Sequence, residues 1–301
     1  MKALCDSVSL WQDLSLENRI PAQKVTDMKK RFNVLALLIF CSFVGAFLSG
    51  CAPSTPPKLT PETAKQFLKL RGYNYDEGSF HGAVKAKDVA AVNAFLAAGM
   101  NPNVKEPISQ AAPLIASSAR GDIEIVRTLL NARAEVNAKD RGGYTPILRA
   151  LEKSNLEIAD LLLARPEIDL NAQGASGVTV LMQYVGLNND EMVRKVLDRG
   201  ANVDLQDSDG DTSLHRAAQS GNVKILDLLL ARGAKPDVKN KVGGTPLMWA
   251  AVFGHQDAAR ALLEKGADPS LKDNQGRTAS DWAIENKRDE VAQLLQTAEK
   301  K

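Results

Sequence analysis

A threonine that returns every 33 or 34 residues constrains this chain more than any other feature. It stands at positions 145, 179, 212, 245 and 278, and a glycine two places before it keeps the same step. A fixed period in this range is typical of a solenoid, in which each short unit packs only against its neighbours. We therefore predict a row of stacked repeats rather than one globular core.

The clearest unit, residues 210–234, has the pattern of two helices. We expect the Thr212 hydroxyl to cap the first helix. Gly221 should end that helix, because glycine tolerates the left-handed conformation that follows a helix. The second helix has apolar side chains at helical spacing, at Val223, Leu226, Leu229 and Leu230. Each unit is thus predicted to be a helix pair with a hairpin-like turn.

Residues 210–234 and 243–268 carry Gly-x-Thr-(Pro/Ser)-Leu, a pair of alanines, a helix-ending glycine, a leucine pair and Gly-Ala. This pattern resembles the ankyrin-repeat family. The resemblance implies an all-α solenoid of about six to seven helix-turn-helix repeats with hairpin-like turns. It also implies a binding scaffold without chemistry of its own, so we expect no enzyme, no cofactor and no metal.

The period divides the chain into units. An N-terminal helix and a divergent capping repeat are expected in residues 59–104, because a terminal unit has one face in water. The repeats of residues 105–301 are predicted at 107–140, 143–172, 177–207, 210–240, 243–273 and 276–298. The repeat at 177–207 departs most from the pattern, since Tyr184 replaces the first alanine. That tyrosine either bulges outward or opens the stack.

The N-terminal part has a different character. Residues 28–50 combine a basic head, a short apolar run and small residues, as a secretory signal does. They end in Leu48-Ser49-Gly50-Cys51, which resembles the lipobox of bacterial lipoproteins. That resemblance implies cleavage before Cys51, acylation of Cys51 and insertion of its lipids in a bilayer; the alternative is an uncleaved anchor. Residues 51–58 then form a proline-rich tether.

Residues 1–27 do not fit a signal, because they carry four acidic side chains. We expect translation to start at Met28 and this stretch to be a misassigned extension. Ala52 follows the cysteine where the lipoprotein family's inner-membrane retention signal has aspartate. The sequence therefore favours the outer membrane of a bacterial envelope, with the repeats facing the periplasm.

Few side chains suggest catalysis. The three histidines show no zinc-protease spacing, and His215 stands where the ankyrin family uses histidine to bond turn backbone. A hydrolase that uses Asp211, Ser213 and His215 is the catalytic alternative. Residues 51–301 hold 32 basic and 32 acidic side chains, so no general positive field favours nucleic acid.

The family resemblance places a protein partner on the turn tips and on the inner helix face. The candidate residues there are Arg141, Tyr144, Glu152, Lys153, Ser208, Asp209, Asp211, Gln219, Lys241, Val242 and Phe253. Tyr144 and Phe253 stand out, because aromatic side chains often anchor interfaces. The alternative is that each of them packs on the next repeat.

The function predicted from these features is a membrane-anchored periplasmic scaffold that binds another protein. One version is an accessory factor that protects a periplasmic enzyme, and another is an immunity protein that neutralises a secreted toxin. A cytoplasmic effector with an internal translation start is a further alternative, which requires the 28–51 signal to be accidental.

Overall fold

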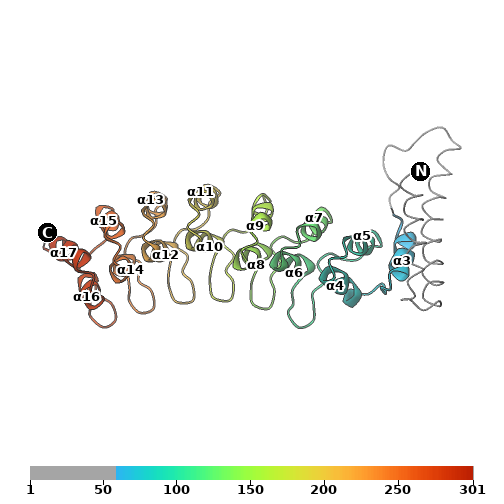
Figure 1. Cartoon of the computed structure of the whole chain (residues 1–301), viewed down its shortest axis with the longest axis horizontal. Helices are drawn as coiled ribbons and strands as arrows, with labels where there is room; N and C mark the ends of the chain where they lie inside the picture. Colours follow the sequence, from blue (N-terminus) through green and yellow to red (C-terminus); the bar gives the residue numbers. More distant parts are fainter. Residues whose placement is uncertain (1–58, 301) are drawn as a thin grey trace, which may run out of the picture.

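The computed structural model describes residues 59–300, which form fifteen α-helices and no strand (Figure 1). The predicted extension, the signal, Cys51 and the tether lie outside these described residues. Within residues 59–300, no helix has both the length and the apolar character that a bilayer crossing needs.

Fourteen of the helices form seven consecutive pairs. The pairs are α4 (Glu77–Lys85) with α5 (Val89–Ala97), α6 (Pro113–Arg120) with α7 (Ile123–Asn131), α8 (Pro146–Glu152) with α9 (Leu156–Leu163), α10 (Val180–Gly186) with α11 (Asp190–Asp198), α12 (Ser213–Ser220) with α13 (Val223–Ala231), α14 (Pro246–Phe253) with α15 (Gln256–Glu264), and α16 (Ala279–Glu285) with α17 (Asp289–Glu299). The predicted all-α solenoid of stacked helix pairs is confirmed.

The seven pairs stand in one bowed row (Figure 1). The first helix of each pair packs on the first helix of the next pair. The second helices lie on the convex side and pack on one another in the same way, except that α9 and α11 make little contact. We call these the inner and the outer helices. The long turns between pairs project from the inner-helix side, so inner helices and turns together form the concave surface.

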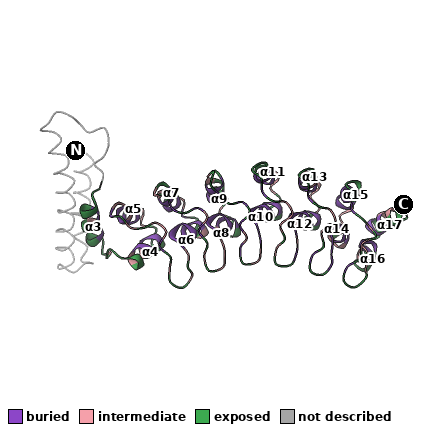
Figure 2. Cartoon of the chain, turned by 180° about the vertical axis from the view of Figure 1, so that it is seen from behind, coloured by how far each residue is buried: buried purple, intermediate pink, exposed green. Residues whose placement is uncertain are grey.

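Small residues let the inner helices approach closely. Ala217 and Ala218 of α12 and Ala250 and Ala251 of α14 are completely buried. Figure 2 shows buried residues in the helices all along the row. The buried face of α13 differs in part from the prediction. Ile225, Leu226 and Leu229 form it, whereas Val223 and Leu230 are half-buried.

The helix ends and their caps agree with the sequence prediction except at Thr145. Gly221 and Gly254 adopt φ of 70° and 76° and end their helices, as predicted for Gly221. The hydroxyls of Thr179 and Thr245 accept from backbone N–H groups of α10 and α14. Thr145 makes no such bond in the described part of the chain. Thr212 and His215 form a capping box at the start of α12, in which the Thr212 hydroxyl also pairs with Nδ1 of His215 at 2.9 Å.

The N-terminal end of the row is covered by α3 (Pro61–Leu70), which packs against α5. The Thr60 hydroxyl caps this helix, and a proline occupies its first turn, as the sequence suggests. Ala64 and Leu68 are buried in that contact. This helix shields the apolar side of the first pair from water.

Tyr184 does not bulge outward. Only 1% of its surface is exposed, which makes it the largest fully buried side chain in the described residues. Within residues 59–300 its hydroxyl finds no hydrogen-bond partner. Burial, with the charge of Asp160 as a smaller cause, raises the pKa of this hydroxyl. The fourth pair thus accommodates the ring inside the core and leaves one polar atom unpaired.

Candidate partner-binding surface

The turns are joined to one another by backbone hydrogen bonds. Arg141 N donates to Ser109 O, Ser208 N to Ser176 O, and Lys241 N to Asp209 O, at 2.8–2.9 Å. Each bond connects equivalent positions of neighbouring turns. These bonds hold the turn tips that they join in register.

A polar side chain at the base of each turn holds the turn's backbone. One carboxylate oxygen of Asp140 accepts from the N–H groups of Gly142 and Tyr144 at 2.8 and 3.0 Å. Asp207 and Asp273 bind the second and fourth residues after them in the same way. We call these residues the turn acids.

The second oxygen of a turn acid accepts from the fourth residue of the following inner helix. Arg149 donates to Asp140 at 2.6 and 2.8 Å, and Arg216 donates to Asp207 at 2.8 Å. In the last repeat Trp282 Nε1 donates to Asp273 at 2.8 Å. This fourth helix position forms a row along the concave surface, at Ala116, Arg149, Gln183, Arg216, Trp249 and Trp282.

Most of the predicted partner-binding residues are exposed on this concave surface. Those on turn tips are Arg141, Ser208, Asp209, Lys241 and Val242, and those at the ends of inner helices are Glu152, Lys153, Gln219 and Phe253. Val242 has the largest exposed fraction among the apolar ones, at 53%. All of these side chains are accessible to a partner.

Two of the predicted partner-binding residues, Tyr144 and Asp211, contact other residues of the chain. Tyr144 is half-buried, with the Arg149 guanidinium 3.9 Å from its ring centroid. Its ring also covers Gly174 of the next turn so closely that a Cβ there would lie 2.8 Å from it. The carboxylate of Asp211 accepts from Asn240 Nδ2 at 2.8 Å. For Tyr144 the structure therefore supports packing on the next repeat.

Charged candidates on α8 belong to an ion-pair chain. Arg149 joins Asp140 to Glu152, whose carboxylate is 2.8 Å from the guanidinium. Lys153 lies 3.7 Å from the same carboxylate. Because both ions of an exposed pair stay hydrated, such contacts are weak and a partner can replace them.

An aromatic strip lies at the end of the row, and sequence reasoning found only part of it. Phe253 is 39% exposed and stacks on Trp249 with ring centroids 6.0 Å apart. Trp249 meets Trp282 edge to face at 6.3 Å, and the ring of His255 stacks with Phe253. The missed signal was the tryptophan that replaces arginine at the fourth helix position of the last two repeats.

The residues of the hydrolase alternative do not form a catalytic arrangement. Both ring nitrogens of His215 are used, since Nδ1 accepts from Thr212 N at 3.1 Å and Nε2 bonds Gly244 O at 3.1 Å. Burial lowers the pKa of His215, and its exposed fraction is 1%. Asp211 bonds Asn240 instead of this ring. Among residues 59–300 no three potential ligands gather as a metal site would need.

The helix-pair solenoid and its continuous concave surface define a repeat scaffold for protein interaction. A family model for ankyrin repeats matches three times, at residues 80–174, 167–240 and 232–301. The chain belongs to the ankyrin-repeat family.

Relatives share the repeats over part of their length. A putative ankyrin repeat-containing protein of Treponema pallidum is 35% identical over 149 residues, which span 49% of each chain. The putative ankyrin repeat protein YahD of Escherichia coli is 33% identical over 133 residues, 42% of this chain and 66% of YahD. The phosphocholine transferase AnkX of Legionella pneumophila matches over only 15% of its length. The activity in its name therefore implies nothing about this chain.

Proposed function

We propose that this protein is a membrane-anchored periplasmic scaffold that binds a partner protein on its concave surface. The observation that carries the proposal is the continuous row of exposed turn tips and inner-helix ends, held in register by backbone bonds between turns. Because these side chains are fixed before binding, little conformational entropy is lost when a partner docks. The ankyrin-repeat family supports binding as the general role.

The aromatic strip is the part of this surface best suited to anchor a partner. Buried or half-buried aromatic side chains supply much of the binding energy at protein interfaces. Phe253 is exposed and stacks on Trp249, which in turn meets Trp282.

The anchor rests on the sequence alone. The segment from Met28 to Cys51 supports export and acylation at Cys51, and Ala52 favours the outer membrane. Metabolic labelling of cells with palmitate tests this part. We expect label in the wild-type chain and none in Cys51→Ala; an unlabelled wild-type chain would exclude the lipid anchor and leave the repeats unaffected.

Binding is tested by recovering the full-length chain from crosslinked cells. We expect one protein to accompany the wild type, and its recovery to fall at least about tenfold in Phe253→Asp. Lys224→Asp on the outer helix α13 is the matched control, because Lys224 is exposed on the convex side. Equal recovery with both variants would contradict the concave surface as the binding site.

A further inference from the structure

One repeat lacks the side chain that pairs with its turn acid. In the turn before α6, Glu106 takes the place of the turn acid, in a loop one residue longer than the others. One oxygen of its carboxylate accepts from both the backbone and the hydroxyl of Ser109. The fourth position of α6, where Arg149 and Arg216 stand in other repeats, is Ala116.

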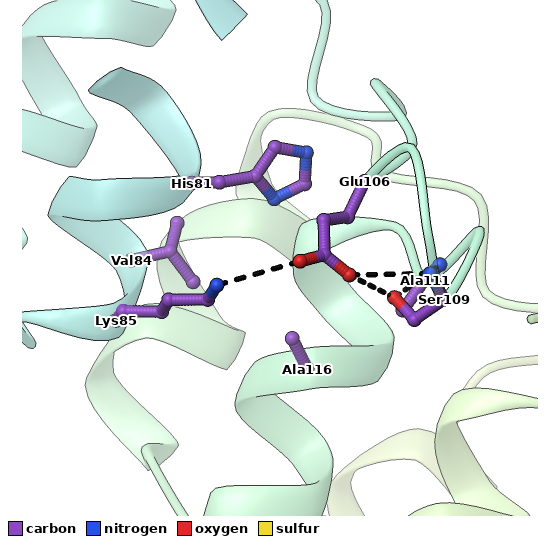
Figure 3. A pocket seen from close by; sticks show the side chains of 7 residues that line it. All are labelled: His81, Val84, Lys85, Glu106, Ser109, Ala111 and Ala116. Carbon is purple, nitrogen blue, oxygen red and sulfur yellow. Dashed lines mark hydrogen bonds and ion pairs between the residues drawn. The ribbon is translucent and has the colours of Figure 1, made fainter. Parts of the chain in front are cut away.

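A pocket lies beside Ala116, at the helix position where two other repeats carry an arginine. It has a volume of about 260 Å³, counted to its open mouth, and is lined by Ala116 and Glu106 together with His81, Val84, Lys85, Ser109 and Ala111. Figure 3 shows the carboxylate of Glu106 and the ring of His81 facing this space, with Ala116 on the opposite side.

The pocket offers hydrogen-bond acceptors. Hydrogen bonds from Ser109 lower the pKa of Glu106, so its carboxylate is ionised near neutral pH. Only 7% of His81 is exposed, and Figure 3 shows its ring nitrogen Nδ1 directed toward the space beside the Glu106 carboxylate. Burial lowers the pKa of His81 despite the opposing charge of Glu106. A neutral imidazole and a carboxylate at one opening favour a donor-rich cation.

Lys85 is the lining side chain that already pairs with the carboxylate. Its Nζ lies 3.5 Å from the second carboxylate oxygen of Glu106, and its side chain is 62% exposed. A contact of this length between exposed ions is weak. An incoming cation can therefore displace the Lys85 ammonium group, which can turn away into solvent.

We propose that this pocket receives an arginine side chain of the partner protein. The guanidinium would pair with Glu106 as Arg149 pairs with Asp140 and Arg216 with Asp207 in their own repeats. The imidazole ring of His81 would lie beside the same planar group, since it lines the same opening. This inference rests on the proposed scaffold function, because the arginine comes from the bound protein.

The direct test is an NMR titration of the full-length chain with N-acetyl-arginine amide. The chain has three histidines, so the ring signals of His81 can be followed with His215 and His255 as internal references. We expect a saturable shift of His81 alone. N-acetyl-citrulline amide, the neutral probe of equal shape, should bind at least about tenfold more weakly, as should the arginine probe with Glu106→Gln. Equal shifts with both probes would overturn the inference.

A variant of the chain gives a second test that needs no ligand. Ala116→Arg should place a guanidinium in the pocket, raise the midpoint of thermal unfolding and abolish the response to the arginine probe. Ala116→Gln is the matched control, because glutamine occupies this row naturally at Gln183. The gain from Ala116→Arg should disappear in Glu106→Gln; a gain that persists there would contradict pairing with this carboxylate.

The two proposals fail in different ways. A negative titration with intact partner recovery through Phe253 overturns the arginine pocket alone. A positive titration without any recovered partner overturns the scaffold function. It also overturns the claim that a partner protein supplies the arginine.

Discussion

The indole N–H of Trp282 donates a 2.8 Å hydrogen bond to Asp273, whereas that of Trp249, at the same helix position one repeat earlier, is buried without a partner among the described residues. The difference lies at the base of the turn, where Asn240 stands in place of the acid. Its oxygen accepts from Val242 and Gly244. Its nitrogen is a donor, which bonds Asp211, so no acceptor remains for Trp249.

The missing hydrogen bond can be supplied by exchanging two residues. Asn240→Asp alone sets two carboxylates together, because Asp211 lies opposite, and should lower the free energy of unfolding. With Asp211→Asn added, the new amide at position 211 can donate to the new carboxylate at position 240, which keeps an acceptor for Trp249. We expect the double variant to exceed wild type by about 1 kcal/mol in urea unfolding. Equal stability of single and double variants would contradict this account.

Gly174 is required by the ring of Tyr144. A Cβ at residue 174 would lie 2.8 Å from that ring, over which the Arg149 guanidinium also lies. We expect Gly174→Ala to cost about 1–3 kcal/mol of unfolding free energy, as overpacking does. In a Tyr144→Ala background the same change should cost almost nothing. A double-mutant cycle by urea unfolding measures the coupling, and additive effects would show that the two residues do not interact.

Because the Tyr184 hydroxyl has no partner among the described residues, we expect that its removal does not destabilise the protein. Tyr184→Phe should leave the unfolding free energy unchanged or raise it by up to about 1 kcal/mol, because no hydrogen bond is lost. The pKa of this hydroxyl is raised in the folded chain. Wild type should therefore lose stability as pH rises above about 10, the ordinary tyrosine pKa, and the variant less so. A loss of stability in Tyr184→Phe at neutral pH would mean that the hydroxyl has a partner.

Acid should weaken the last repeat through Asp273. Burial alone would raise the pKa of this carboxyl, but hydrogen bonds from Arg277, Trp282 and Gln275 outweigh it and hold the pKa well below its usual range. A depressed folded pKa gives stability that is present at neutral pH and lost as pH falls below about 4. The stability difference between wild type and Asp273→Asn should therefore shrink between about pH 5 and pH 2, measured by urea unfolding. A constant difference would contradict this assignment.

The fold was predictable because its determinants are local and repeated. The step of Thr145, Thr179 and their counterparts shows the period, and glycines such as Gly221 mark the helix ends. Each helix pair packs mainly on its neighbours, so no distant pairing had to be guessed. Tyr184 was not predictable, since whether a large ring fits inside a stack depends on the space left by residues of three adjacent pairs.

The candidate surface was predictable in outline only. The repeat places Lys241 and Val242 on a tip and Phe253 at a helix end, and all three are exposed. The roles of Tyr144 and Trp249 depend on the side chains that they meet in neighbouring repeats. The repeat period alone does not identify those side chains. The pocket beside Glu106 was not predictable from the sequence. It lies where Ala116 replaces the arginine of other repeats, and that correspondence is clear only when equivalent helix positions are known in three dimensions.

The central claim is that the concave surface binds a protein. Site-specific photo-crosslinking in living cells tests it most directly, with a photoreactive residue placed in turn at Phe253, at Lys241 and at Lys224. The account predicts a crosslink to the same protein from Phe253 and Lys241 and none from Lys224 on the outer helix α13. Crosslinks of equal yield from all three positions, or from Lys224 alone, would contradict it.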